Sequence, residues 1–306
     1  MRYFIITIDT EGDNLWHYNS GEKVMTENSR YIPRFQELCE KYGFKPVWLT
    51  NYEMVCDQRY VDYIKPKMEA GLCEVGIHVH AWNNPPIYKL EDKYGGNPYL
   101  IEYPYEIMRE KFKVTYDLLT SKFGRKPISH RAGRWAMNEE YFNLLAEFNI
   151  KVDCSYTPTK SWVDSPGSTL SGGTDYSKAN KHPHYIGDVL EMPTSLTRSR
   201  VQAAKTSLTI KDILKSLIKG KYIWLRPACT SLDDMNWLTQ KIHKSNTSDY
   251  LMFMMHSSEM MPGGSPYFPD NDAIERMYDV VEKYFKYVVS LGYKGVSMSD
   301  YIELHK

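Results

Sequence analysis

Carboxylate, imidazole and guanidinium side chains recur in this chain directly after short apolar segments. These polar groups are Asp9 and Glu11 after Tyr3–Ile8, His78 and His80 after Glu74–Ile77, His130, Arg131 and Arg134 after Ile128, Asp153 at the end of Ile150–Asp153, and His256 after Leu251–Met255. If the segments are parallel strands of a barrel, their carboxyl ends meet at one rim, where such barrels carry their active sites. The pattern therefore predicts one shared site.

The first two groups have the composition of a metal site. Asp9, Glu11 and Asp13 crowd one short turn, and like charges at this density raise their pKa values unless a cation binds. His78 and His80 are two residues apart, so both can point to the same side of a strand. Imidazoles with a carboxylate form a typical catalytic zinc site. We expect a divalent metal ion, zinc, on His78, His80 and a carboxylate of this turn.

The remaining groups have the composition of acid–base machinery. Arg131 and Arg134 flank a glycine at a strand end, and one of them could hold the carboxylate of Asp9 or bind an anionic substrate. His256 lies in a polar His-Ser-Ser-Glu segment that follows five apolar residues, and Asp153 ends another strand. An aspartate that orients an imidazole is a recurrent general acid–base device, so we expect Asp153 to orient His256.

Aromatic and cationic residues near these motifs are candidates for substrate binding. Aromatic rings offer flat apolar faces against which sugar rings can stack. The candidates are Trp82, Arg134, Trp135 and Tyr156, with Trp162 as a further aromatic. Most of the 25 tyrosines in the chain are expected to pack in the interior instead.

The elements that carry these residues alternate between strand and helix patterns, which indicates parallel strands joined by helices. The expected strands are Tyr3–Ile8, Pro46–Leu49, Glu74–Ile77, Ile128–His130, Ile150–Asp153, Val189–Met192, Leu251–Met255 and Gly295–Ser297. The expected helices are Arg30–Tyr42, Tyr105–Phe123, Asn138–Phe148, Thr209–Ile218, Ser231–Lys244 and Asp272–Ser290. We predict an α/β fold, a distorted (β/α) barrel with seven or eight parallel strands.

We expect residues 1–306 to form a single catalytic domain, because no repeat or low-complexity linker interrupts the pattern. A segment rich in Ser, Gly, Thr and Pro, at about residues 157–188, predicts a long loop that serves as a wall or lid over the substrate, or as a plain surface excursion. The first strand is not followed by Gly-x-Gly-x-x-Gly, which disfavours a dinucleotide-binding fold.

The overall composition narrows the classes of partner. Formal net charge is zero and the sequence pI is about 7.1, so no global basic field favours nucleic acid. Apolar runs are too short for membrane insertion or for a signal-peptide core. The five cysteines are scattered and form no Cys-x-x-Cys pair, which is typical of reduced thiols and predicts a cytoplasmic location. The oligomeric state is not predicted.

The order of these motifs resembles the polysaccharide deacetylase family, also called the NodB homology or carbohydrate esterase 4 family, over residues 3 to 300. Ile-Thr-Ile-Asp-Thr-Glu-Gly-Asp resembles its first motif and implies that Asp9 is the general base. Glu-Val-Gly-Ile-His-Val-His resembles the second and implies that His78 binds metal. The third motif matches at Arg131, which would hold the base aspartate.

The later motifs continue the resemblance. Asp153-Cys154-Ser155 is similar to the fourth motif, and His256 matches the histidine that acts as general acid in the fifth. Three segments look like a WalW-like cytoplasmic branch of the family, namely His-Arg-Ala-Gly-Arg-Trp, Val-Asp-Cys-Ser-Tyr-Thr-Pro and Met-His-Ser-Ser-Glu-Met-Met-Pro-Gly. The resemblance implies a NodB-like barrel and a metal-dependent hydrolase that removes an N-acetyl or O-acetyl group from an acetylated sugar or polysaccharide precursor.

The sequence departs from the family at two metal ligands. The second aspartate of the first motif falls at Thr10, so Glu11 or Asp13 must replace it, and Glu11 is preferred. The second histidine of the second motif falls at Trp82, so His80 must take over. Without these replacements the metal site is absent, although some relatives with degenerate motifs work without a metal.

Three other functions remain open at this point. The same scaffold would serve a metal-free amidase that acts on a small non-sugar amide, or a catalytically inactive relative that only binds carbohydrate. Glycoside hydrolysis needs two carboxylates that flank the scissile bond. Asp9 and Asp153 could form such a pair, but that hypothesis leaves both motif histidines without a role.

Overall fold

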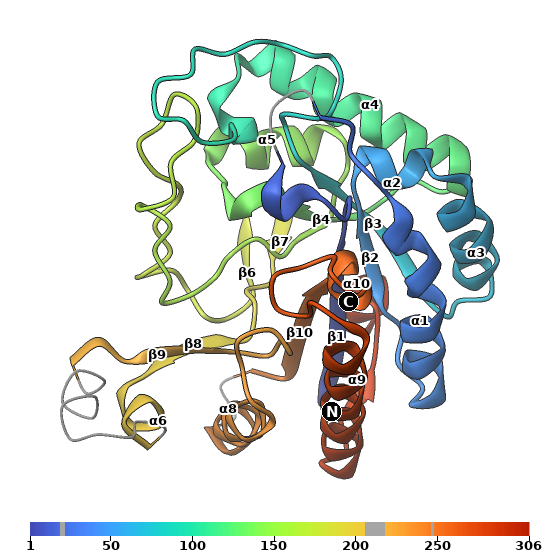
Figure 1. Ribbon diagram of the computed structural model, residues 1–306, viewed down its shortest axis with the longest axis vertical. Coiled ribbons are helices and arrows are strands. Elements are labelled where there is room, and N and C mark those ends of the chain that lie inside the picture. Colours follow the sequence, from blue (N-terminus) through green and yellow to red (C-terminus); the bar gives the residue numbers. More distant parts are fainter. Residues whose placement is uncertain (19–21, 206–217, 246–247, 306) are drawn as a thin grey trace.

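A curled, mostly parallel sheet forms the centre of the fold in a computed structural model that describes residues 1–18, 22–205, 218–245 and 248–305 (Figure 1). In spatial order its strands are β10 (Tyr250–His256), β1 (Tyr3–Thr10), β2 (Val47–Thr50), β3 (Glu74–Val79), β4 (Ser129–Ala132), β5 (Val152–Asp153), β7 (Val189–Glu191) and β6 (His184–Ile186), while β11 (Lys294–Gly295) pairs with β1. Only the pair β6–β7 is antiparallel among the described strands of this sheet. Seven consecutive parallel strands thus form a half-barrel, and the predicted fold class is confirmed.

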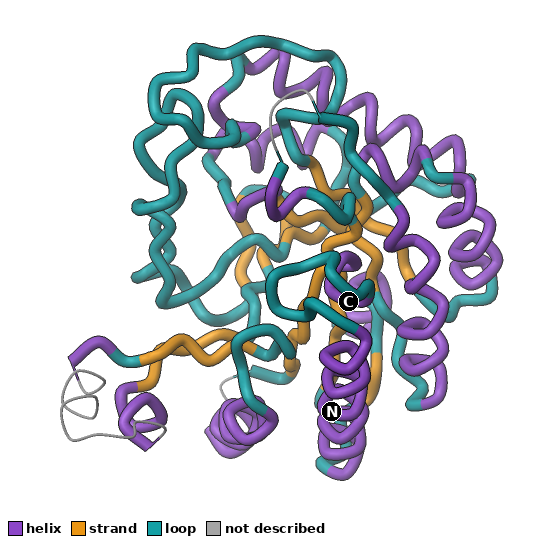
Figure 2. The backbone as a smooth tube through the Cα atoms, viewed as in Figure 1, coloured by secondary structure: helices purple, strands orange, loops and turns teal. Residues whose placement is uncertain are grey.

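Helices cover the outer side of the sheet (Figure 2). The α-helices are α1 (Ile32–Lys41), α2 (Tyr52–Cys56), α3 (Gln58–Glu69), α4 (Tyr105–Phe123), α5 (Glu139–Glu147), α6 (Arg200–Lys205), α8 (Leu232–Ser245), α9 (Asn271–Ser290) and α10 (Met298–Leu304). Short 3-10 turns are η1 (Leu15–His17), η2 (Glu27–Tyr31), η3 (Leu100–Glu102), η4 (Gly133–Trp135) and η5 (Ser257–Met260). None of the described helices combines the length and the apolar content that crossing a lipid bilayer requires.

Local sequence signals explain where the principal helices begin and end. Asn138 and Asp270 cap α5 and α9, because each side chain accepts a hydrogen bond from a backbone N–H of the first turn. Helix α4 ends at Gly124, whose φ of 71° lies in the left-handed region that glycine adopts without steric cost. Five of the six expected helices form within two residues of their predicted bounds. Nearly all of the sixth, Thr209–Ile218, lies outside the described residues.

Alternation along the strands sorts their side chains between two apolar layers. On β1, Phe4, Ile6 and Ile8 pack on the helix side of the sheet, while Tyr3 and Ile5 pack on the concave side. The concave layer also contains Met298 and Tyr301 of α10. Because successive strand side chains point to opposite faces, this alternation decides which polar residues at the strand ends face the inside of the half-barrel.

The open edge of the half-barrel is bordered by a hairpin that the sequence did not predict. Strands β8 (Leu196–Ser199) and β9 (Lys221–Trp224) form a separate antiparallel pair. The chain beside them contacts β10, because the backbone N–H of Met252 donates to Ser195 Oγ and that of Met254 donates to the carbonyl of Leu225. Residues 157–188 form an irregular loop apart from β6 and an isolated bridge between Ser161 and Asp175.

Candidate active site

The carboxyl ends of the strands bring the polar residues of the motifs together. Asp9 on β1 pairs in register with His256 on β10, and His78 on β3 pairs with Arg131 on β4. These four side chains belong to the concave face, since they continue the alternation of the concave apolar layer. All four are buried or nearly so.

Arg131 holds the carboxylate of Asp9 through one oxygen. Its Nη1 donates to Asp9 Oδ1 at 2.6 Å, its Nη2 donates to Thr7 Oγ1 at 2.6 Å, and its Nε donates to the carbonyl of Cys154. Burial alone raises the pKa of Asp9, but the charges of Arg131 and of two histidines outweigh burial and lower it below the ordinary value. Asp9 is therefore ionised, and its Oδ2 is left for other partners.

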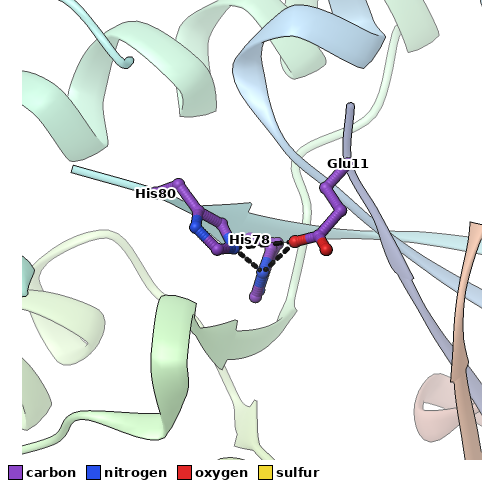
Figure 3. A group of neighbouring side chains, drawn as sticks. All are labelled: Glu11, His78 and His80. Atoms are coloured by element: carbon purple, nitrogen blue, oxygen red, sulfur yellow. Dashed lines mark hydrogen bonds and ion pairs between the residues drawn. The ribbon is translucent and has the colours of Figure 1, made fainter. Parts of the chain in front are cut away.

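Glu11, His78 and His80 converge on one point (Figure 3). The Nε2 atoms of the two histidines are 2.9 Å apart, and Glu11 Oε2 lies 2.7 Å from His80 Nε2 and 3.5 Å from His78 Nε2. Their three ligand atoms all lie within 4.8 Å of one another, and all three residues are buried. Burial raises the pKa of Glu11, but the two imidazoles outweigh it and lower that pKa well below its usual value.

This group fits a divalent metal ion such as zinc. His78 Nδ1 lies 2.8 Å from the carbonyl oxygen of Arg131, which can only accept, so Nδ1 carries the proton and Nε2 keeps its lone pair. Such a second hydrogen bond is the usual way in which proteins orient a metal-binding histidine. Two imidazole nitrogens and one carboxylate oxygen are ligands that zinc prefers, with a further position left for water or substrate.

The alternation of side chains along β1 explains why Thr10 does not join Glu11, His78 and His80. Thr10 follows Ile8 on the helix side of the sheet, and its hydroxyl donates to the carbonyl of Ile8. Glu11 has the same parity as Asp9 and faces the concave side. Asp13 lies farther along the turn, where its carboxylate accepts the backbone N–H of Asn28 at 3.1 Å. The structure therefore brings Glu11 and not Asp13 to the two histidines.

His256 lies beside the carboxylates of Asp9 and Glu11. Its Nε2 lies 3.7 Å from Asp9 Oδ2 and 3.9 Å from Glu11 Oε1, and its Nδ1 lies 3.5 Å from Glu259 Oε1. Burial lowers the pKa of His256, but Glu259 and Glu11 outweigh it and raise that pKa above the ordinary value of 6.5. The imidazole is thus biased toward its protonated form.

The expected pairing of Asp153 with His256 is wrong. Asp153 faces the helix side of the sheet, where its Oδ1 lies 2.6 Å from His130 Nδ1 and accepts the hydroxyl of Ser155 at 2.8 Å. The neighbouring strand residues Val152 and Cys154 belong to the concave layer, so alternation turns Asp153 away from the site. The carboxylate beside His256 belongs to Glu259 instead.

Each polar residue of the segment that follows β10 contacts the site. Ser257 Oγ donates to the carbonyl of Glu11 and accepts its backbone N–H, both at 3.1 Å. Ser258 Oγ accepts the indole N–H of Trp16, whose ring meets the ring of His256 edge-on at 5.0 Å. Glu259 accepts hydrogen bonds from the backbone N–H of His256 and from Arg226. The sequence marked this segment as polar, and Glu259 was its unassigned residue.

A cavity of about 560 Å³ opens over these groups. Trp82, Arg134 and Trp135 line it as expected from the sequence, whereas Tyr156 packs against Phe142 and Tyr176 and is not among its lining residues. Other lining residues, which the sequence did not single out, are Trp16, Lys160, Tyr222, Trp224, Arg226 and Tyr267. They come from turns and from the β8–β9 hairpin, where no strand-end pattern marks them.

Arg134 fixes the wall of the cavity and does not point a free charge into it. Its guanidinium donates to the backbone carbonyls of Asn97 and Pro166 and to the hydroxyl of Ser165. Arg134 and Trp135 both have left-handed backbone conformations, with φ values of 55° and 65°, which cost on the order of 1–2 kcal/mol per residue. Such strain is typical of functional sites, and here it directs the Trp135 ring toward Trp162, with parallel ring planes and centroids 6.3 Å apart.

No family model matches this sequence, and no curated protein matches it. Solved structures share its fold. A protein of Mycobacterium smegmatis assigned as a polysaccharide deacetylase has a TM-score of 0.55 and 14% identity, over 99% of this chain and 90% of that chain. A GH57 branching enzyme from Thermococcus kodakaraensis has a TM-score of 0.58 and 10% identity, over 100% and 71% of the two chains. A 4-alpha-glucanotransferase from Thermococcus litoralis has a TM-score of 0.56 and 14% identity, and this chain spans 40% of its length.

The chain has a deacetylase-like fold. Because glycan-transferring enzymes share that fold, the choice between the chemistries depends on the residues of the site.

Proposed function

We propose that this protein is a metal-dependent carbohydrate deacetylase, which hydrolyses an N-acetyl or O-acetyl group on an acetylated sugar or polysaccharide precursor. One observation carries the proposal. An ionised, arginine-held carboxylate, Asp9, lines the same cavity as a convergent metal-ligand group and lies beside a histidine biased toward its protonated form. A base, a cation site and an acid are the three groups that amide or ester hydrolysis needs.

Glu11, His78 and His80 would hold the metal ion. A divalent ion bound there supplies Lewis acidity, which polarises the acetyl carbonyl and lowers the pKa of water. The protein prepares this site through the carbonyl of Arg131, which orients His78, and through Ser257, which fixes the backbone of Glu11.

Asp9 acts as the general base. Arg131 occupies Oδ1, so Oδ2 is the atom that accepts a proton from the attacking water. Because Asp9 is held ionised by neighbouring charges, it is competent as a base at neutral pH. The guanidinium also fixes the carboxylate in one orientation, since it bonds Thr7 and Cys154 at the same time.

His256 acts as the general acid. Its Nε2 faces the same space as Asp9 Oδ2 and is placed to protonate the leaving amine or alcohol. Glu259 is the positioning residue for His256, because its carboxylate lies beside Nδ1 and accepts the backbone N–H of the histidine. Trp82 and Trp135 in the wall offer ring faces for the sugar.

The arrangement of carboxylates disfavours glycoside hydrolysis. The cavity lining contains two carboxylates among the described residues, namely Asp9 on β1 and Glu11 directly after that strand. Two carboxylates on one side do not flank a glycosidic bond. Asp153 is not available as the second member, because it is buried against His130 on the helix side.

The first test measures zinc content and acetate release together. We expect protein purified without added metal to contain about one equivalent of a divalent ion, and the His78→Ala, His80→Ala double variant to lose it. Asp9→Asn should keep the metal and the fold but lose acetate release from acetylated sugars. Acetate release that persists in Asp9→Asn would refute the role of the base.

Two further results would each replace the proposal. No metal in either protein, even after zinc is added, together with amide hydrolysis would indicate a metal-free amidase. Sugar binding without any acetate release would indicate an inactive carbohydrate-binding relative.

A further inference from the structure

Two cationic side chains line the cavity that His256 also lines, and neither comes from the strands that carry the proposed catalytic residues. Lys160 belongs to the 157–188 loop, and Arg226 follows β9. Arg226 is linked to His256 through Glu259, which contacts both. Burial and the nearby positive charge of Arg226 both lower the pKa of Lys160. Both cations thus line the same cavity.

The positive charge in this wall is not balanced by acidic side chains. Within the described part of the chain, no carboxylate lies within 4.0 Å of Lys160 Nζ, which instead lies 4.1 Å from the ring centre of Trp162 and 5.1 Å from that of Tyr222. The side chain of Arg226 donates a single hydrogen bond within the same residues, from Nη2 to Glu259, and its buried Nε has no partner. Glu259 is shared with His256, so it neutralises only part of the charge.

The carboxylates at the floor of the cavity are engaged elsewhere. Asp9 is paired with Arg131, and Glu11 lies against His78 and His80. A divalent ion at the proposed metal site would make the cavity still more positive. Two desolvated cations with unused N–H groups favour a ligand that brings its own negative charge.

We propose that Lys160 and Arg226 bind an anionic group, a carboxylate or a phosphate, on the acetylated sugar substrate. The identity of the ligand as an acetylated sugar rests on the proposed function, whereas the binding of an anionic group does not. Trp162 contacts both Lys160 and Trp135, since its ring centre lies 4.1 Å from the ammonium of Lys160 and its ring plane is parallel to that of Trp135. A sugar ring against these indoles would place an acidic substituent near Lys160.

Arg134, the third cation of the lining, is not part of this anion site. Its guanidinium is taken up by the carbonyls of Asn97 and Pro166, by Ser165 and by the ring of Tyr99. These contacts fasten the 157–188 loop to the segment before η3. The inference therefore assigns recognition to Lys160 and Arg226, and loop anchoring to Arg134.

The test is a binding measurement that does not depend on turnover. Calorimetric titration of the intact protein would compare the affinities of three sugars. N-acetylglucosamine carries no anionic group, N-acetylglucosamine 1-phosphate carries a phosphate, and N-acetylmuramic acid carries a carboxylate. We expect at least one anionic sugar to bind about tenfold or more tighter than the neutral one, as a charge-assisted hydrogen bond provides. The anionic sugar that binds with the higher affinity shows whether the site prefers a phosphate or a carboxylate.

Variants assign that preference to the proposed side chains. Lys160→Met should abolish most of the preference, and Lys160→Arg should retain it. Lys178→Met is the matched control, because Lys178 is an exposed lysine of the same loop that does not line the cavity. Thermal melting of Lys160→Met checks that the loop still folds, and if this variant unfolds, the loss of the preference in Arg226→Lys is measured instead.

Each outcome is decisive. The anion site would be overturned by equal affinity for neutral and anionic sugars, or by no binding of either anionic sugar. It would also be overturned by a preference that survives in Lys160→Met, which would then be due to the metal site. Tight anionic binding without acetate release would support the anion site while the proposed deacetylase function fails. Acetate release from neutral sugars, with no preference for anionic sugars, would support the deacetylase function while the anion site fails.

Discussion

Arg131 bonds one oxygen of Asp9 and leaves the other free. Nη1 of Arg131 lies 2.6 Å from Asp9 Oδ1, while Oδ2 lies on the side of His256. Both residues are buried and come from strands that are separated by β2 and β3 in the sheet. The pair thus fixes the base across the width of the half-barrel.

Removal of Arg131 should therefore cost stability as well as activity. Arg131→Met leaves Asp9 as a buried charge without its partner, and we expect a loss of about 3–5 kcal/mol in the free energy of unfolding. The control is Arg34→Met, since Arg34 pairs with Glu275 on the surface and such pairs contribute at most about 1 kcal/mol. Urea denaturation of both variants gives the comparison, and equal losses would contradict the role of Arg131.

The metal ligands can be separated by a matched pair of variants. Glu11→Gln should weaken zinc binding by at least about 100-fold, since even residues that only orient ligands contribute 10–100-fold. Asp13→Asn should leave zinc affinity unchanged, because Asp13 bonds the backbone of Asn28 away from the histidines. Competition with a chromogenic chelator measures both affinities. Loss of zinc in Asp13→Asn and not in Glu11→Gln would reverse the assignment.

Glu259 should set the alkaline limit of activity through His256. Its negative charge helps to raise the pKa of His256 above 6.5, so catalysis that needs protonated His256 declines as pH rises through this raised pKa. In Glu259→Gln the raised pKa falls, and the alkaline limb of the kcat/KM profile should move to lower pH, with a rate about 10–100-fold lower.

Asp153→Asn provides the comparison for Glu259→Gln. Asp153 contacts His130 and not His256, so the alkaline limb should keep its position in this variant. A shift in Asp153→Asn with none in Glu259→Gln would restore the original pairing of Asp153 with the acid.

A buried pair of acids on the helix side should make stability depend on pH. Burial and the carboxylate of Asp153 raise the pKa of Glu191 well above its ordinary 4.5, so Glu191 holds a proton in the folded state. The unfolded chain releases that proton above about pH 4.5, and stability is therefore lost as pH rises from there toward the raised pKa.

Glu191→Gln should remove this dependence. The amide can accept the backbone N–H of Tyr156, as Glu191 Oε1 does, and donate to Asp153 in place of the acid proton. Melting curves of the variant and the parent should agree near pH 4.5 and separate as pH rises, with the variant higher by at least about 2 °C at neutral pH. Curves that stay parallel over this range would show that Glu191 is ionised in the folded protein.

The strand-end pattern in the sequence determined much of the fold and the core of the site. Apolar runs that end in Asp9, His78, Arg131 and His256 predicted both the parallel strands and their common rim, because carboxyl ends of parallel strands meet. The alternation of side chains at the end of β1 was also present in the sequence, since Asp9 and Glu11 are two residues apart and Thr10 lies between them. That alternation places Glu11, and not Thr10, on the same face as Asp9.

Only the tertiary structure decided the partner of His256 and the walls of the cavity. In a parallel strand buried on both faces, such as β5, apolar residues stand on either side of Asp153, so the sequence does not show which face it joins. Lys160 and Arg226 lie in a loop and beyond a hairpin, where no periodic pattern fixes direction. Their place in the cavity that His256 also lines depends on how distant segments pack against the open edge of the half-barrel. That packing is a long-range property that local sequence does not encode.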